Sequence, residues 1–339
     1  MLIPKEVKNI IDKLKKAGFE AFIVGGCVRD FLQHNENAAS SRDEASLALL
    51  VRDWDITTNA KPEEIQKVFP NSFYENNFLT VTVRTGSKKP ELAEIEITTY
   101  RLEAKYSDKR HPDNVKYADT IQEDLARRDF TVNAMAIGLK SQILNPKSQT
   151  NSKFKTLNSK LVLVDLFDGQ KDLKNKIIKT VGNPEERFSE DALRMMRAVR
   201  FATTLNFTIE ENTKKAIQKN SIWLEAISKE RVQDEFLKII MADPVRKTEQ
   251  SGISNLSEKK SKYKNSDKPS SEISKKEISE DGLSNGAGPA HGIELLRELG
   301  LLKYIVPELE EGYGVAQNKH HIYDCYWHSL KALEYAAKK

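Results

Sequence analysis

The feature that most constrains this chain is a short apolar segment that ends in two glycines and is followed by a helical pattern. Residues 21–24 read Ala-Phe-Ile-Val and predict a strand, and Gly25 and Gly26 follow directly. Glycine adopts backbone conformations that strain other residues, so its amide groups approach a ligand closely. A helix that begins at Val28 would direct the positive end of its dipole to the same place. This order predicts a phosphate-binding turn, with a purely structural turn as the alternative. It is not a dinucleotide fingerprint, because Gly-x-Gly-x-x-Gly is absent.

Two carboxylates follow in the next predicted strand, over residues 53–56. Asp53 and Asp55 are two positions apart, and alternate side chains of a strand point to the same side. Two close carboxylates repel each other unless a cation or a proton lies between them. Mg²⁺ prefers oxygen ligands and commonly takes both carboxylate and substrate phosphate. We therefore interpret the pair as a metal site, with a solvated surface pair as the alternative.

A third carboxylate is expected from the strand predicted over residues 93–99. Glu94 and Glu96 face the same side, while Ile95 and Ile97 face the core. Either glutamate would complete a three-carboxylate site, and an exposed strand face is the alternative interpretation. Two metal ions about 3.5–4 Å apart would serve an in-line displacement, one at the attacking hydroxyl and the other at the leaving pyrophosphate.

Basic side chains near these carboxylates are candidates for binding a triphosphate. Arg29 lies in the first turn of the helix after the glycines, where Asp30 either caps the helix or orients the arginine. Arg127 and Arg128 are adjacent, and guanidinium groups bind phosphate oxygens in a two-pronged manner. A structural ion pair between Arg128 and Asp129 is the alternative. The candidate nucleotide-binding residues of this region are Gly25, Gly26, Arg29, Arg128, Asp129 and Asn133.

A second nucleotide-binding group is predicted on a single helix. At about 100° per residue, four charged residues share one exposed stripe opposite the apolar face. They are Glu190, Asp191, Arg194 and Arg197. A carboxylate accepts from the exocyclic amine of C or A, and an arginine donates to the adjacent ring nitrogen, by the logic of base-edge recognition. Asp191 and Arg194 would therefore select C and A, because U and G present a carbonyl instead of the amine. A weak surface ion pair is the alternative.

Composition permits a nucleic-acid partner without requiring one. The formal net charge is +4, from 54 Lys and Arg against 50 Asp and Glu, so a basic surface must be local. The two cysteines, Cys27 and Cys325, lie far apart, which favours a reducing, cytoplasmic location. The N-terminus lacks the apolar run of a leader peptide, and no stretch of about 18 apolar residues predicts a membrane span. We expect no membrane partner, and the sequence leaves the oligomeric state unknown.

Shifts in composition divide the chain into five parts. The predicted parts are a head at 1–140, a connecting segment at 141–184, a helical neck that binds RNA and nucleotide at 185–245, a low-complexity insert at 246–288 and a helical body at 289–339. The insert lacks the apolar surface that offsets ordering entropy, so we predict that it is disordered. The body stops in mid-pattern, so we expect that the natural domain continues or has been shortened.

Six segments, in order, resemble the motifs of the tRNA nucleotidyltransferase and bacterial poly(A) polymerase family, in its CCA-adding branch. They are residues 22–30, 53–58, 96–101, 127–133, 190–194 and 230–237. The resemblance implies an α+β fold, in which a nucleotidyltransferase palm with a mixed β-sheet precedes all-helical neck and body domains. It implies that Asp53, Asp55 and Glu96 are the catalytic carboxylates and bind Mg²⁺, which favours Glu96 over Glu94.

The same resemblance implies template-independent addition of CMP and AMP, from CTP and ATP, to the 3′ end of tRNA. Residues 77–83 lack the Gly-Arg-Arg-Phe-like segment common in poly(A) polymerases, which favours tRNA as the acceptor. Residues 106–117 resemble the flexible loop that enzymes adding only CC often lack, which favours complete CCA addition. The alternatives are a poly(A) polymerase, an enzyme that adds only CC or A, and an inactive RNA-binding module.

Three features depart from the family pattern or lie outside it. The connection at 34–51 is long, and Leu79 stands where the family usually has Gly. His328 and residues 320–324 resemble the opening of a metal-dependent phosphohydrolase domain of the HD type. An imidazole without further ligands is not a metal site, and no His-Asp pair follows, so we expect helix packing there.

Overall fold

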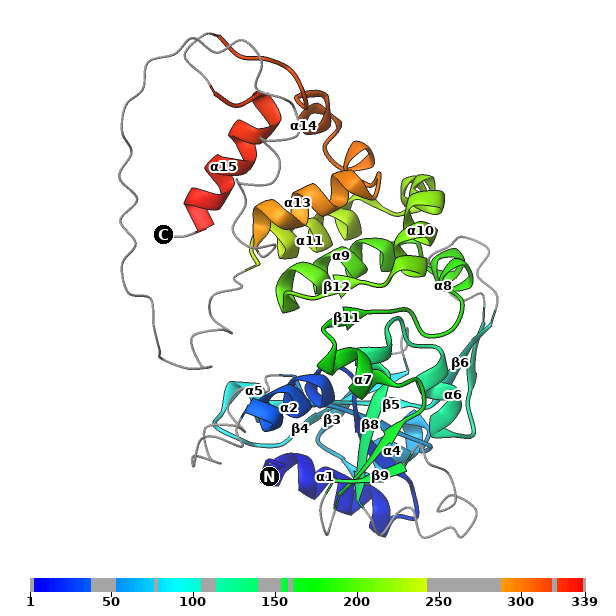
Figure 1. The fold of residues 1–339 in the computed structure, drawn as a ribbon. Helices are drawn as coiled ribbons and strands as arrows, with labels where there is room; N and C mark the ends of the chain where they lie inside the picture. The colour runs from blue at the N-terminus through cyan, green and yellow to red at the C-terminus, as the bar shows by residue number, and fades with distance from the viewer. Residues whose placement is uncertain are drawn as a thin grey trace. The chain divides into compact units, whose positions relative to one another are not determined.

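The computed structural model describes residues 3–37, 53–75, 79–104, 114–139, 154–157, 161–242, 288–318 and 322–337. The chain divides into two compact units (Figure 1). The first contains residues 1–198 and 208–227, and the second contains residues 199–207 and 228–339.

The first unit is built around one mixed β-sheet. Within the described residues the sheet has eight strands: β1 (Ala21–Val24), β2 (Asp55–Thr58), β3 (Ser72–Glu75), β4 (Thr80–Arg84), β5 (Glu94–Thr99), β8 (Met135–Leu139), β9 (Phe154–Thr156) and β10 (Leu161–Asp165). Their order across the sheet is β3-β4-β5-β2-β1-β8-β10-β9. The β2–β5 pair is parallel and the other neighbours in this sheet are antiparallel. The prediction of a mixed sheet in an α+β fold is confirmed.

Short helices accompany the sheet in this unit. They are α1 (Lys5–Lys16), α2 (Gly26–Asn37), α4 (Pro62–Val68), α5 (Pro90–Ala93), α6 (Ile121–Ala126), the 3₁₀ turn η3 (Thr131–Asn133), α7 (Gly169–Lys174), α8 (Pro184–Glu190), α10 (Glu211–Asn220) and the 3₁₀ turn η5 (Ser221–Ala226). Two small ladders complete it, β6 (Arg101–Ala104) with β7 (Asn114–Tyr117), and β11 (Ile177–Ile178) with β12 (Thr208–Ile209). The β12 strand is an exception to the all-helical neck that the resemblance implies.

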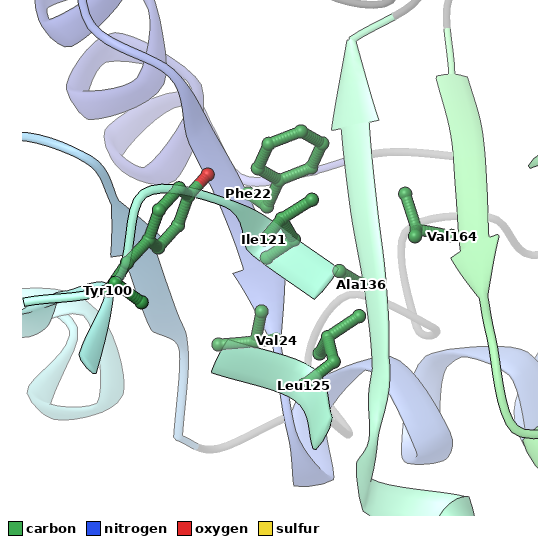
Figure 2. Packing of buried hydrophobic residues seen from close by; sticks show 8 residues of the cluster. Phe22, Val24, Tyr100, Ile121, Leu125, Ala136 and Val164 are labelled. Carbon is green, nitrogen blue, oxygen red and sulfur yellow. The ribbon is translucent and has the colours of Figure 1, made fainter. Parts of the chain in front are cut away.

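Helix α6 covers one face of the sheet. Figure 2 shows Ile121 and Leu125 of α6 beside Phe22 and Val24 of β1, in a cluster that also includes Val164 of β10. All four residues of β1 are buried, so its opposite face is covered as well. Helices α1 and α2 contact β1. The apolar stripe of α1 is buried as its spacing predicts. Burial on both faces fixes β1, and therefore fixes where the glycine turn after it lies.

The second unit is helical in its described residues. It contains the end of α9 (Leu193–Leu205), α11 (Lys229–Ile240), α13 (Pro289–Glu298), the 3₁₀ turn η6 (Leu302–Tyr304), α14 (Pro307–Glu311) and α15 (Cys325–Ala337). A Cβ added to Gly292 would lie 2.5 Å from Ile239 Cγ2 and 2.8 Å from Thr203 Oγ1, so α13 approaches α11 and α9 closely. Tyr326 on α15 donates to Glu294 on α13 at 2.6 Å. The predicted return to helices after residue 289 is confirmed.

Several predicted boundaries are wrong. Helix α2 begins at Gly26 instead of Val28 and continues to Asn37, into the long connection at 34–51. The segment 106–117, which resembles a flexible loop, contains strand β7, and β7 pairs with β6. Strands β9 and β10 join the sheet, so the sheet extends past residue 140 into the predicted connecting segment.

Other predictions fall outside the described residues. These are the loop at 38–52, the centre of the flexible loop at 105–113, nearly all of the insert at 246–288, and residues 319–321 with His320 and His321. In the part of the chain that is described, no helix has the length and apolar character needed to cross a membrane.

Candidate functional site

The strand register brings two of the three predicted carboxylates together. Asp55 is the partner of Glu96 across the parallel β2–β5 pair, and of Val24 across the antiparallel β1–β2 pair. Partners in register point to the same face of a sheet. Asp55 and Glu96 therefore share the face that α6 covers, at the end where β1 runs into the glycine turn. Glu94, the alternative to Glu96, instead pairs with Arg84 at 3.2 Å, in an exposed ion pair where β4 ends and β5 begins.

Asp53 reaches the same site by a different route from the predicted one. Strand β2 begins at Asp55, so Asp53 precedes the strand, is exposed, and is not one of two alternating strand residues. Trp54 between them is buried. Burial, followed by the charge of Glu96, raises the pKa of Asp55 to about 6, and Asp53 adds to this while Arg128 opposes it. The three predicted carboxylates and Arg128 thus act on one another electrostatically.

The glycine turn runs beside these groups. Gly25 has a φ of +81°, in the left-handed region that favours glycine. A Cβ at Gly25 would lie 3.3 Å from Arg128 Nη1 and 3.5 Å from Asp55 Oδ2. Gly26 starts the 12-residue helix α2, so its positive end lies at the turn. Backbone, guanidinium and carboxylate therefore meet where the sequence predicted a phosphate.

Arg128 retains an unsatisfied donor at this place. Its Nη2 donates to Asp124 at 3.2 Å, whereas its Nε is buried and has no hydrogen-bond partner among the described residues. A buried donor without a partner is costly, so such a group indicates a missing ligand or water. The Arg128 atom that lies at the glycine turn is Nη1, where an anion would contact it.

Arg29 is oriented by protein groups. It donates to Asp30 Oδ1 at 2.9 Å from Nε and to Asn133 Oδ1 at 2.7 Å from Nη1. Asp30 was considered either as a helix cap or as a residue that orients Arg29, and this hydrogen bond supports the second role. The bond from Arg29 to Asn133 links α2 to η3. Asn133 in turn donates to Asp129 at 3.5 Å.

Asp129 pairs with a residue far away in the sequence. Arg197 Nε donates to Asp129 Oδ2 at 2.9 Å, so the alternative Arg128–Asp129 ion pair is not formed. Burial alone would raise the pKa of Asp129, but Arg197, with Arg194 and the Phe130 amide, lowers it to about 2. Asp129 is therefore ionised at neutral pH and holds Arg197 against the head.

The predicted base-selecting stripe is not a single helix. Helix α8 ends at Glu190, Asp191 has an extended backbone, and α9 begins at Leu193, so the helical-wheel prediction is wrong here. Asp191 Oδ1 accepts from the Leu193 amide at 3.0 Å and so caps the start of α9. A carboxylate in this position is the usual way to satisfy the first amides of a helix.

Arg194 is buried, with 8% of its surface exposed, and is not on an exposed stripe. It pairs with Glu190, and it donates to the carbonyl of Arg187 at 3.2 Å and of Arg127 at 3.4 Å. Glu190 and Arg194 are thus adjacent across the break between α8 and α9. Glu190, Asp191 and Arg194 therefore lie at the joint between α8 and α9, whereas Arg197 lies further along α9 and pairs with Asp129.

The donor set fits a metal that arrives with phosphate ligands. In the described residues no group of three or more His, Cys, Asp or Glu side chains has the spacing of a complete metal site. Asp55 and Glu96 still offer only acceptor oxygens when ionised, and burial together with the charge of Glu96 raises the pKa of Asp55. Mg²⁺ is commonly held by one or two carboxylates plus substrate phosphates, which suits this arrangement.

Three residues near the site were not predicted from the sequence. Asp124 contacts Arg127, Arg128 and Thr57, and its spacing of three and four residues from the arginines is the signal that would have indicated it. Cys27 is buried, donates to the Val24 carbonyl at 3.0 Å, and has its pKa raised to about 12 by burial and by Asp55. The neighbourhood of Thr57 and Asp124 depends on strand register, which the sequence does not show.

We predict that Asp55→Asn stabilises the ligand-free protein at pH 8. A carboxyl whose pKa is raised by folding favours the folded state when protonated, and that benefit is lost as the pH rises through about 6. Removing the charge should raise the free energy of unfolding by about 1–3 kcal/mol at pH 8, and the gain should shrink towards pH 3. Urea unfolding at several pH values, without metal, measures it. Glu94→Gln is the control, and an equal, pH-independent gain in both variants would contradict the prediction.

Two family models match this chain. Residues 21–179 match the family described as "Poly A polymerase head domain", and residues 206–250 match "Probable RNA and SrmB- binding site of polymerase A". The first match contains the glycine turn, the carboxylates and both adjacent arginines. The second begins within the helical region that follows the α8–α9 joint.

The chain is also similar to proteins and to a solved structure that are named CCA-adding enzymes. It is 42% identical over 248 residues to a CCA-adding enzyme of Ligilactobacillus salivarius, with 70% of this chain and 50% of the relative covered. It is 44% identical over 231 residues to the CCA-adding enzyme of Lactobacillus helveticus, with 68% and 48% covered. The structure of the Bacillus stearothermophilus CCA-adding enzyme in complex with CTP matches with a TM-score of 0.54 at 31% identity, over 72% of this chain and 51% of that one.

The chain spans about half the length of the curated relatives it matches. This chain itself matches the head-domain model and the polymerase-type RNA-binding model. Together with the mixed sheet, the glycine turn and the paired carboxylates, these matches place the chain in the tRNA nucleotidyltransferase and bacterial poly(A) polymerase family.

Proposed function

We propose that this chain adds CMP and AMP, from CTP and ATP, to the 3′ end of tRNA without a nucleic-acid template. The observation that supports this most is the meeting of Gly25, Arg128, Asp55 and Glu96 in a chain whose curated relatives are named CCA-adding enzymes. The related structure that holds CTP supports a nucleoside triphosphate as substrate. The two free cysteines are consistent with a cytoplasmic location, which is part of the proposal.

The glycine turn and the basic side chains would hold the triphosphate. The amides at Gly25 and Gly26 and the start of α2 supply donors and a positive dipole end. Arg128 supplies Nη1, which lies 3.3 Å from the Cβ position of Gly25. Arg29, fixed by Asp30 and Asn133, adds positive charge beside the turn. Asp129 would contribute by holding Arg197 and, through Asn133, Arg29.

The carboxylates would hold the divalent metal. The family generally uses a divalent metal, and we propose Mg²⁺, with Asp53, Asp55 and Glu96 as its protein ligands. When bound, Mg²⁺ neutralises the triphosphate and polarises the phosphorus that is attacked. Asp55 must be ionised to act as a ligand, which its pKa of about 6 permits at neutral pH.

The proposed reaction is a displacement at the α-phosphate. The tRNA 3′ oxygen forms a bond to the α-phosphorus, the bond between this phosphorus and the bridging oxygen breaks, and pyrophosphate leaves. The hydroxyl proton passes to solvent or to a carboxylate. Arg128 at the turn stabilises the negative charge that develops on the leaving pyrophosphate.

Base selection is assigned to the joint between α8 and α9. We assign Asp191 and Arg194 to the base edge, with Glu190 and Arg197 as supporting residues. The contacts of Arg194 with Glu190 and two backbone carbonyls fix its guanidinium in one place, and a preorganised donor discriminates better than a mobile one.

The number of nucleotides added to tRNA is the direct test of the proposed function. Purified protein, Mg²⁺ and a tRNA that lacks its last three nucleotides should add three nucleotides when given CTP and ATP, and then stop. Sequencing gels measure the product. Two nucleotides or one would indicate a partial enzyme, and a long A ladder a poly(A) polymerase, which the name of the matching head domain makes a specific rival. Binding of tRNA without incorporation would favour the inactive module.

Removal of the carboxylates should abolish incorporation. Asp55→Ala and Glu96→Ala are each expected to lower the rate by about a thousandfold, because several kcal/mol of metal-derived charge stabilisation are lost. Glu94→Gln, on the same strand but paired with Arg84, is the matched control and should retain activity. Turnover that survives in Asp55→Ala, with an intact circular dichroism spectrum, would refute the metal assignment.

Asp191→Ala should relax base choice. Loss of a base-edge contact worth about 1–3 kcal/mol should reduce the preference for C and A over U and G by about tenfold. Incorporation rates with all four nucleotides measure this. Because Asp191 also caps α9, the control is Asn183→Ala, which removes the cap of α8. If both variants keep the same preference, base selection by Asp191 is wrong.

A further inference from the structure

Asp124 is a buried carboxylate that connects three parts of the site. Its side chain has no exposed surface, and it lies on α6 above the β2 strand. Oδ1 accepts from Arg127 at 3.0 Å from Nε and at 2.8 Å from Nη2. Oδ2 accepts from Arg128 Nη2 at 3.2 Å and from Thr57 Oγ1 at 3.3 Å. One carboxylate therefore joins both adjacent arginines to the strand that carries Asp55.

Helix α6 holds Asp124 rigidly. Thr120 and Glu123 form a reciprocal cap at its start, in which the Thr120 side chain accepts from the Glu123 amide and the Glu123 side chain accepts from the Thr120 amide. Ile121 and Leu125 anchor the helix in the core against β1 (Figure 2). The cap and the two buried side chains fix the part of α6 that carries Asp124. Its partners are therefore placed by it.

The charges around Asp124 leave one positive charge in excess. Burial would raise the pKa of Asp124, but Arg127 and Arg128 lower it, so the carboxylate is ionised. One negative charge faces two positive ones. Arg128, the nearer of the two arginines to the glycine turn, also faces the Asp55 carboxylate there.

The two arginines use Asp124 differently. Arg127 donates to it from both Nε and Nη2, the two-pronged arrangement that commits one edge of a guanidinium. Arg128 donates from Nη2 alone, while its Nη1 lies 3.3 Å from the Cβ position of Gly25 and its buried Nε has no partner among the described residues. Arg128 is thus the arginine that presents donors to the turn.

We propose that Asp124 is a positioning residue that holds Arg128 beside the glycine turn, so that Arg128 rather than Arg127 contacts the triphosphate. This inference rests on the proposed binding of a nucleoside triphosphate at the turn. Arg127 serves as the second counter-charge of Asp124 and, through its carbonyl, as an acceptor for Arg194 at 3.4 Å.

Electrostatics and positioning predict opposite results for Asp124→Asn. The substitution removes a negative charge next to the site, which by Coulomb attraction alone would tighten binding of a polyanion. If Asp124 positions Arg128, the same substitution weakens binding, because Arg128 loses the contact that directs its other donors. The sign of the change therefore distinguishes the two.

The experiment measures equilibrium binding of inorganic tripolyphosphate and of CTP, each with Mg²⁺, by titration calorimetry. We expect Asp124→Asn and Arg128→Gln each to raise the Kd for tripolyphosphate about tenfold, as loss of one charge-assisted contact does. In the double variant, Asp124→Asn should add no further loss, because it acts through Arg128. Arg127→Gln should have the smaller effect. Asp165→Asn, a buried carboxylate that caps α7, is the matched control and should bind as the wild type does.

Three results would overturn the inference. These are tighter or unchanged tripolyphosphate binding in folded Asp124→Asn, additive losses in the double variant, and a larger effect of Arg127→Gln than of Arg128→Gln. The Arg127 and Arg128 comparison decides the matter if Asp124→Asn does not fold. Wild-type protein that binds tripolyphosphate but incorporates no nucleotide would refute the proposed function and leave this inference standing. Wild-type protein that binds neither ligand would refute both.

Discussion

Asp55 is an inward-facing carboxylate whose partner on the neighbouring strand is a second carboxylate, Glu96. Parallel pairing of β2 and β5 forces this contact, because register places both side chains on one face. Their repulsion disfavours the charged state and is opposed within the chain by Arg128. The position of Arg128 depends in turn on Asp124 and on the closeness of Gly25. The strands, the turn and α6 are thus arranged around a repulsion that a bound cation would remove.

The local elements of the fold were largely predictable from the sequence. Val7, Ile10, Ile11 and Leu14 recur at helical spacing, which indicates α1. The Ala-Phe-Ile-Val run with two glycines indicated β1 and its turn. The apolar run of β10 carried the same kind of signal but lay in a segment predicted as a connection. Strands β6 and β7 have no strict alternation of polar and apolar residues, and their pairing across a sequence gap is what forms them. Pairing of distant strands is a tertiary effect that propensity does not reveal.

The sequence named several residues that the structure brings together, but it did not reveal most of their contacts. Asp55, Gly25 and Arg128 come together because each lies at or next to the end of a strand or helix, and Glu96 joins them through its register with Asp55. The pairing of Asp129 with Arg197 joins residues 68 positions apart, and no local pattern encodes it. The helical wheel failed at Asp191 because it assumes an unbroken helix, although an aspartate before an apolar helical run is itself a helix-start signal. A charged residue should therefore be considered as a helix cap before its spacing is used to place it on a helix face.

The thiol of Cys27 gives the glycine turn a built-in reporter. It is enclosed directly after the turn, donates to the Val24 carbonyl, and has its pKa raised to about 12, so almost none of it is thiolate at neutral pH. Thiolate is the reactive form towards alkylating reagents. Alkylation of this side chain thus requires the turn to open, and its rate reports how often the backbone around Gly25 and Gly26 departs from the closed arrangement. Cys325, partly exposed in the second unit, supplies an internal reference in the same molecule.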